Sequence, residues 1–253
     1  MKGYDVLLKH VPELNKRSGK YKFAGIGFGA FALTTAYFII TDQIPTWTID
    51  SQIVVMALGF LLVSRLFTRK KALIEKFKDM AYSYAFGRFA LPGLAVIFAA
   101  IVHIAYMNGP KFTQPTFVTI STVLGWYLLI VGALLWIRSA FTIGLDHLAM
   151  LYVYFPEEGG MKNTNIYGVL RHPVYAGALR VCIGLALLNT GIYALSFAIL
   201  LPLGFTGWIR LVEEKELIER FGGSYLDYRR RIPAFWSRFR DIGHFFTFLF
   251  TGR

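Results

Sequence analysis

Six long apolar runs, separated by short polar segments, dominate the hydrophobic pattern of this chain. Apolar runs of about 20 residues are long enough to cross the hydrocarbon layer of a membrane as helices. The sequence therefore predicts an all-α fold, a multi-pass transmembrane bundle of about six spans. Only Asn189-Thr190-Gly191 separates the last two runs, so these two helices are expected to be antiparallel neighbours. The runs occupy residues 23–40, 53–67, 89–107, 117–137, 174–188 and 192–211.

Composition and charge agree with a membrane protein. Hydrophobic residues make up 55% of the 253 residues and charged residues 17%, whereas soluble domains have about 25% charged residues. The net charge of +12 could suggest a nucleic-acid partner, but 25 of the 27 Lys and Arg residues lie in segments predicted to face one side of the membrane. Lys111 lies on the other side, and Arg180 lies within a span. The positive-inside rule explains this asymmetry without nucleic acid. It predicts cytosolic N- and C-termini, in a prokaryotic plasma membrane or the endoplasmic reticulum.

A polar region follows the sixth run. Residues 213–231 predict a polar helix that is broken at Phe221-Gly222-Gly223 and ends before Pro233. Residues 239–250 alternate basic and aromatic side chains and are too short to span, so an interfacial helix is expected there. Because the last two runs form a hairpin, Glu213 and Glu214 should return to the membrane face where His172 lies.

Three motifs in this region carry the candidate chemistry. Residues 167–177 contain Arg-His-Pro-x-Tyr, residues 213–217 read Glu-Glu-x-x-Leu, and residues 221–228 read Phe-Gly-x-x-Tyr-x-x-Tyr. This ordered set, over 166–233, resembles the isoprenylcysteine carboxyl methyltransferase family, which is related to membrane phospholipid and thiol methyltransferases. The resemblance implies an S-adenosylmethionine (SAM)-dependent methyltransferase whose cytosolic cofactor pocket is closed by the C-terminal helices. It also implies a lipidic acceptor that enters from the bilayer, with a prenylcysteine-like carboxylate favoured.

The resemblance divides the chain into a region of unassigned role, residues 1–150, and a catalytic SAM-binding region, residues 151–253. Cationic side chains suit the SAM carboxylate, carboxylates suit its ribose and ammonium, and tyrosines suit its adenine and sulfonium. No Gly-x-Gly-x-x-Gly motif indicates a Rossmann-type site. The expected cofactor-binding residues are Tyr167, Leu170, His172, Pro173, Tyr175, Glu213, Glu214, Tyr225, Tyr228 and Arg229. The expected catalytic residues are Arg171, Arg180 and Glu214.

The roles of individual groups leave alternatives open. Arg180, within the fifth run, either snorkels to the membrane surface or faces the bundle and orients the acceptor. A carboxylate acceptor is already ionised, whereas a thiol or amine needs a base, for which the Glu pair or His172 is the candidate. Asp146 and His147 are expected to be structural, because adjacent residues on a helix point about 100° apart. His103 is expected to be a hydrogen-bonded residue of the bundle. The scattered histidines and carboxylates do not form a metal-ligand spacing.

Two other functions remain possible at this point. Membrane sterol and steroid reductases that use NADPH also carry an Arg-His-Pro-x-Tyr run, and a non-catalytic lipid-binding protein could keep the same fold. The identity of the acceptor and the oligomeric state cannot be predicted.

In the first run, Gly25, Gly27 and Gly29 suggest close packing against a neighbouring helix.

Overall fold

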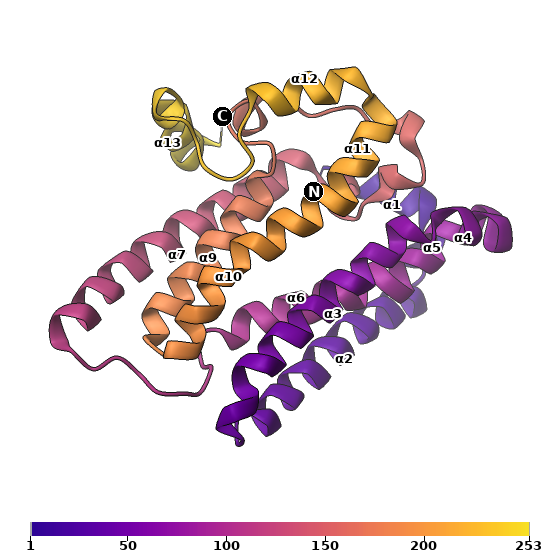
Figure 1. The fold of residues 1–253 in the computed structure, drawn as a ribbon. Coiled ribbons are helices and arrows are strands. Elements are labelled where there is room, and N and C mark those ends of the chain that lie inside the picture. Colours follow the sequence, from indigo (N-terminus) through magenta and orange to yellow (C-terminus); the bar gives the residue numbers. More distant parts are fainter. Residues whose placement is uncertain (1, 253) are drawn as a thin grey trace.

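The computed structural model describes residues 2–252, and long helices that run beside one another make up most of it (Figure 1). Among these residues, five helical stretches are long and apolar enough to cross a membrane. The fifth predicted span forms α9 (Pro173–Asn189), an apolar helix of 17 residues. The predicted all-α transmembrane bundle is thereby confirmed. The five stretches are Arg17–Thr41, Pro45–Thr68, Lys70–His103, Pro115–Ile143 and Ile192–Phe221.

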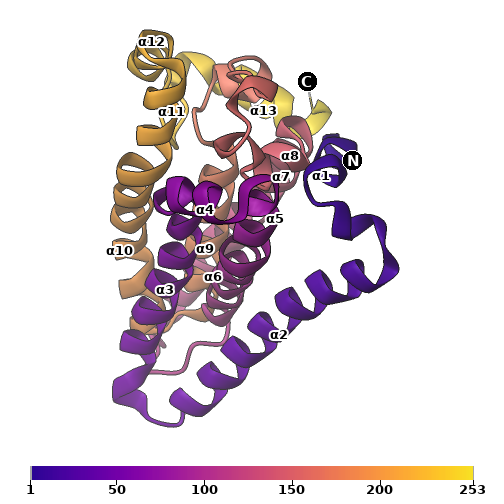
Figure 2. The same cartoon turned by 90° about the vertical axis from the view of Figure 1, so that its right-hand side faces the viewer.

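Short helices gather at one end of the bundle, where both chain termini also lie (Figure 2). The opposite end holds the α2–α3 connection. Both termini therefore lie on the same side of the bundle, as an even number of spans requires. That this side is the cytosolic one stays a prediction from the distribution of Lys and Arg. The long helices are α2 (Arg17–Thr41), α3 (Thr48–Thr68), α6 (Leu91–His103), α7 (Pro115–Ile143), α9 and α10 (Ile192–Trp208). The short ones are α1 (Tyr4–His10), α4 (Lys70–Phe77), α5 (Ala81–Ala85), α8 (Leu145–Leu148), α11 (Glu214–Phe221), α12 (Gly223–Arg231) and α13 (Ile242–Thr251).

The hairpin of α9 and α10 is anchored at its turn by Asn189. Its side-chain amide donates to the carbonyls of Ile104, Ala105 and Met107 at 3.1–3.2 Å, and its Oδ1 accepts from the Gly191 amide at 2.9 Å. These carbonyl groups lie just beyond the end of α6, where the helix provides no further backbone N–H groups to donate to them. The third span therefore ends at His103, and the prediction that it continues to residue 107 is wrong.

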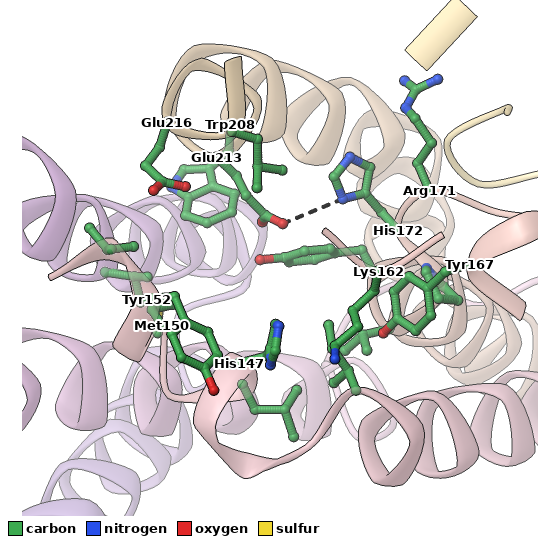
Figure 3. A pocket seen from close by; sticks show the side chains of 18 of the residues that line it. His147, Met150, Tyr152, Lys162, Tyr167, Arg171, His172, Trp208, Glu213 and Glu216 are labelled. Carbon is green, nitrogen blue, oxygen red and sulfur yellow. Dashed lines mark ion pairs between the residues drawn. The ribbon is translucent and has the colours of Figure 1, made fainter. Parts of the chain in front are cut away.

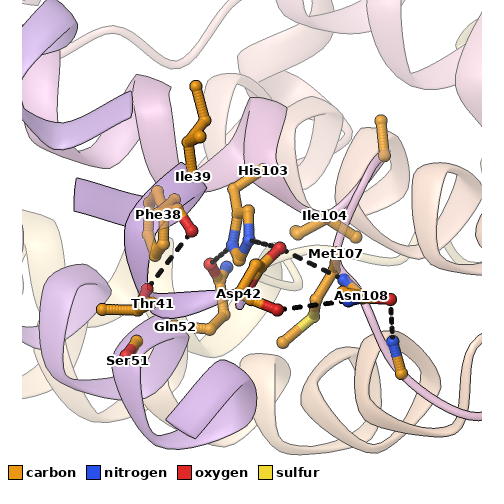
Figure 4. A network of polar contacts seen from close by, with 12 residues as sticks. Phe38, Ile39, Thr41, Asp42, Ser51, Gln52, His103, Ile104, Met107 and Asn108 are labelled. Atoms are coloured by element: carbon orange, nitrogen blue, oxygen red, sulfur yellow. Dashed lines mark hydrogen bonds and ion pairs between the residues drawn. The ribbon is translucent and has the colours of Figure 1, made fainter. Parts of the chain in front are cut away.

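A buried polar network closes the same end of the bundle (Figure 4). His103 Nδ1 lies 2.8 Å from Gln52 Oε1, and its Nε2 lies 3.1 Å from Asp42 Oδ2. Phe38 stacks on the imidazole with ring centroids 3.8 Å apart. Asn108 donates through its side chain to the Asp42 carbonyl. The expectation that His103 is a hydrogen-bonded bundle residue is confirmed, and the network joins α2, α3 and α6.

The closest helix contact joins α7 and α9, and glycines make it possible. A Cβ added at Gly177 would lie 2.5 Å from the Trp136 amide nitrogen, and one added at Gly132 would lie 2.8 Å from Val181 N. The two backbones therefore touch. The expectation of close packing in the first span is wrong at Gly25 and Gly29, since nothing lies within 4 Å of a Cβ built there.

The polar region after α10 adopts the predicted broken helix. Gly222, with φ 56° and ψ −131°, separates α11 from α12, a conformation that L residues other than glycine rarely adopt. After α12 the chain turns back to the start of α9, where the amides of Arg171 and His172 donate to the carbonyls of Pro233 and Ala234. These backbone bonds hold the C-terminal segment against the Arg-His-Pro motif.

Candidate functional site

A cavity of about 420 Å³ lies where the long helices meet the short ones (Figure 3). Its walls come from both halves of the chain: from α3, α6 and α7, and from α9 to α12. One part of the lining is apolar and includes Phe60, Ile97, Trp136, Phe205 and Trp208. The other part is polar and includes His147, Lys162, Tyr167, Arg171, His172, Glu213, Glu216 and Tyr225. The volume lies within the range of small-molecule sites.

Glu214 is the centre of the polar contacts behind this cavity. It is 1% exposed. Its Oε1 lies 3.0 Å from Arg171 Nη2 and 3.1 Å from His172 Nε2, and it accepts a hydrogen bond from the Tyr225 hydroxyl at 3.2 Å. Its Oε2 lies 3.3 Å from Arg229 Nε. Glu214 therefore joins α11 to the start of α9 and to α12. Its Oε1 is fully used by hydrogen bonds, whereas its buried Oε2 has only the ion-pair contact with Arg229.

His172 is placed between two carboxylates. Its Nδ1 lies 3.4 Å from Glu213 Oε1, and its Nε2 lies 3.1 Å from Glu214 Oε1. Ionised carboxylates only accept hydrogen bonds, so both ring nitrogens must donate and the imidazole is charged. Burial opposes this charge, but the hydrogen bonds and charges of Glu213 and Glu214 outweigh it and raise the pKa of His172 above its usual value. The predicted meeting of His172 with the Glu pair across the hairpin is confirmed.

Arg171 is held by the C-terminal segment. Besides the contact with Glu214, its Nη1 donates to the carbonyls of Arg229 and Ile232. Arg171 lines the cavity, but most of its donors are used in fixing the end of α12. Its role in the fold is thus to close the cavity from the side of α12.

The tyrosines of the motifs lie around the same cavity. Tyr228 donates from its hydroxyl to the Tyr167 carbonyl at 2.6 Å. The Tyr175 ring packs edge-on or tilted against Phe205 and Trp208, with centroids 6.1 and 5.8 Å away. Burial raises the pKa of Tyr225 and Tyr228, which keeps both hydroxyls protonated as donors. These residues offer flat faces and hydroxyls next to the charged cluster.

Most of the predicted site residues come together here. Tyr167, Arg171, His172, Pro173, Tyr175, Glu213, Tyr225 and Tyr228 line the cavity. Leu170 and Glu214 are buried behind it, and Arg229 contacts Glu214 from α12.

Arg180 lies apart from this group and is 5% exposed. It donates to the carbonyls of Ala176 and Phe235 at 2.8 and 3.1 Å, and its guanidinium lies 4.3 Å from the centroid of the Trp236 ring. Arg180 faces the protein rather than the membrane surface, and it is not among the residues that line the cavity.

Sequence reasoning missed His147, Tyr152 and Lys162, which line the cavity from the connection between α7 and α9. The expectation that Asp146 and His147 point apart is wrong, because Asp146 Oδ2 lies 3.5 Å from His147 Nδ1. The physical reason is that α8 has only four residues, between Gly144 at φ 99° and Met150 at φ 56°, so long-helix geometry does not apply. No motif in the sequence marks these three residues.

Comparison with known proteins supports the resemblance. Residues 120–224 match the model of the family described as phospholipid methyltransferase. This match confirms the family resemblance read from the motifs. The chain is also 28% identical over 111 residues to protein-S-isoprenylcysteine O-methyltransferase B from Arabidopsis thaliana. That alignment covers 44% of this chain and 56% of the relative, so the chain spans little more than half of the relative's length. No solved structure matches the chain significantly.

The matched segment of the family model contains α9, α10 and α11, and with them His172, Glu213 and Glu214. The region of family similarity therefore contains most of the polar side of the cavity, except Tyr225 and Tyr228, together with Trp136, Phe205 and Trp208 of the apolar side.

Proposed function

We propose that this chain is an integral-membrane methyltransferase that uses S-adenosylmethionine and transfers a methyl group to a lipidic acceptor. The observation that carries the proposal is the joining of His172, Glu213 and Glu214 beside a cavity, within the segment that matches a methyltransferase family. Residues 151–253 would carry the cofactor-binding groups, and residues 1–150 would supply much of the acceptor wall.

The polar side of the cavity fits the chemistry of S-adenosylmethionine. Glu213 faces the cavity with an acceptor for ribose hydroxyls or an ammonium, while His172 beside it is charged. The hydroxyls and rings of Tyr175, Tyr225 and Tyr228 suit an adenine or a sulfonium. His147 also lines the cavity, and neither of its buried ring nitrogens has a hydrogen bond to another described residue. When bound, the cofactor would supply an electrophilic methyl group.

The remaining predicted residues support these groups. Glu214, Arg171 and Arg229 would hold the C-terminal helices closed over the cofactor, because their contacts join α9, α11 and α12. Leu170, Pro173 and Tyr167 shape the wall behind it. Arg180 would act on the acceptor only through the Phe235–Trp236 segment that it holds.

The apolar side of the cavity suits a lipidic acceptor. Phe60, Ile97 and Trp136 come from helices that are apolar enough to cross a membrane, so the acceptor's hydrocarbon would leave water on binding. The Arabidopsis relative is named for isoprenylcysteine, and a prenyl chain is a hydrocarbon of the kind that this wall suits.

Calorimetry of the purified protein with S-adenosylmethionine and with NADPH tests the proposal. Binding of S-adenosylmethionine that is weakened by Glu213→Gln supports it. The matched control is Glu219→Gln, an exposed residue of the same helix α11. Binding of NADPH instead would favour a reductase, and binding of neither would favour a non-catalytic lipid-binding protein. Methyl transfer is then measured with isotopically labelled S-adenosylmethionine and membrane lipid extracts.

A further inference from the structure

His147 is a buried imidazole that lines the cavity. Among the described residues, neither ring nitrogen has a hydrogen-bond partner, and Nδ1 has only an ion-pair contact of 3.5 Å with Asp146 Oδ2. A buried polar nitrogen left in this way costs free energy. Figure 3 shows His147 and Lys162 on one side of the cavity, facing Glu213 and His172 on the other. A ligand in the cavity would therefore meet a free imidazole opposite the expected cofactor groups.

Asp146 orients this imidazole. Its Oδ2 lies 3.5 Å from His147 Nδ1 and accepts a hydrogen bond from the Tyr152 hydroxyl at 2.5 Å. The Tyr152 ring also packs edge-on against the imidazole, with centroids 4.5 Å apart. A carboxylate beside Nδ1 favours the proton on that nitrogen, which leaves the lone pair on Nε2 free to accept one. Tyr152, Asp146 and His147 thus form a chain that ends at the cavity.

The surroundings keep His147 uncharged. Burial is the largest effect and lowers the pKa of His147. Asp146 and the backbone of Gly160 oppose it, the charge of Lys162 adds to it, and the pKa lies below its usual value. The other charged groups on the cavity wall are Arg171, His172, Glu213, Glu216 and Arg220. Burial favours a raised pKa for Asp146, but the hydrogen bond from Tyr152 and the contacts with the side chain and backbone of His147 leave that pKa below its usual value. The neutral imidazole and the ionised carboxylate are the forms that a general base and its partner need.

The alternative bases expected from the sequence are Glu213, Glu214 and His172. Glu213 faces the cavity and forms an ion pair with His172 at 3.4 Å, whereas the other two are more fully engaged. His172 donates from both nitrogens to carboxylates and cannot accept a proton. Glu214 is covered by Arg171, His172, Arg229 and Tyr225. His147 is the histidine of this cavity that is free to accept one.

We propose that His147 is the general base of this site, with Asp146 as its positioning residue, and that the acceptor's reacting atom carries a proton, as in a thiol. This inference rests on the proposed methyltransferase function. A bond forms between the acceptor heteroatom and the methyl carbon, and the carbon–sulfur bond of the sulfonium donor breaks with its electron pair left on sulfur. The acceptor's proton passes to Nε2 of His147, and Asp146 stabilises the resulting imidazolium. A carboxylate acceptor would have no proton to give and would not need this group.

The test compares two probes in the wild type and in His147→Gln. The first probe is farnesyl thiol and the second is N-acetyl-S-farnesylcysteine, whose acceptor is a carboxylate. We expect methylation of the thiol to fall about 10²- to 10⁴-fold in His147→Gln, and the acid limb of its pH–rate profile to disappear. Asp146→Asn should weaken the thiol reaction less. The matched control is His244→Gln, an exposed histidine of α13, which should leave the reaction unchanged.

A second measurement does not depend on turnover. Nuclear magnetic resonance of ¹⁵N-labelled histidines in detergent should show the His147 signal, identified by its loss in His147→Gln, as a neutral imidazole at pH 7. An imidazolium at pH 7 would overturn the inference. So would methylation of the carboxylate probe alone, or thiol methylation unchanged in His147→Gln. Calorimetry separates the two ideas, because a protein that binds no S-adenosylmethionine contradicts the proposed function itself, whereas these results contradict only the role of His147.

Discussion

Replacing Glu214 by glutamine should destabilise the protein strongly, because Glu214 is the buried anion that three cations share. The side chains of Arg171 and His172 are 12% and 4% exposed, and both lie within 3.2 Å of Glu214 Oε1. Glutamine keeps the shape but loses the charge, which leaves these cations without their common partner. Breaking a buried ion pair from one side costs about 3–5 kcal/mol.

The lower end of that range applies here. Arg171 keeps two backbone carbonyls as acceptors, His172 keeps Glu213, and Arg229 is 36% exposed and therefore screened by solvent. A loss of about 3 kcal/mol corresponds to a fall in melting temperature of roughly 6–12 °C for a chain of this size. The fall should come with a loss of S-adenosylmethionine binding, since α11 and α12 would no longer be tied to α9.

Thermal unfolding in detergent, followed by circular dichroism, measures the effect, with Glu219→Gln as the matched control. Glu219 lies on the same helix but is exposed, so its replacement should change stability by less than about 0.5 kcal/mol. If Glu214→Gln melted at the same temperature as Glu219→Gln, the central role given to this carboxylate would be wrong.

Three further outcomes follow from the contacts. Because the pKa of His172 is raised in the folded protein, its ion pairs stabilise fully below about pH 6.5 and are lost as pH rises through the raised value; the melting temperature should fall over that window in the wild type and not in His172→Gln. Gly177→Ala should cost about 1–3 kcal/mol by forcing α9 from α7, whereas Gly204→Ala on α10, where nothing lies within 4 Å, should not, and equal melting temperatures would contradict the close contact. Tyr228→Phe removes the hydrogen bond to the Tyr167 carbonyl and should cost about 1 kcal/mol; an unchanged unfolding free energy in denaturant titration would show that this bond adds nothing.

The helices and the pairing of the two motifs could be predicted because they depend on local patterns. Apolar length defines a spanning helix in any context, and a three-residue turn permits only an antiparallel neighbour. The hairpin alone predicts that Glu213 and Glu214 return to the membrane face of His172, and the structure adds the direct contacts between them. The break at Gly222 is likewise local, since only glycine readily adopts its conformation.

Tertiary contacts, and not local patterns, determine which of the polar residues near the cavity still have unused hydrogen-bonding groups for a ligand. Arg171 donates to the carbonyls of Arg229, in α12, and Ile232, just after it. Arg180 is held by Phe235 and Trp236. Both partners come from more than 50 residues away, and no periodicity encodes such a pairing. The position of His147 depends on the irregular path of the chain between α7 and α9. There the positive φ angles of Gly144 and Met150, rather than helix periodicity, set the direction of the side chains. A hydrophobic pattern specifies which face of a helix is buried, but a loop acquires its shape from the surfaces it packs against.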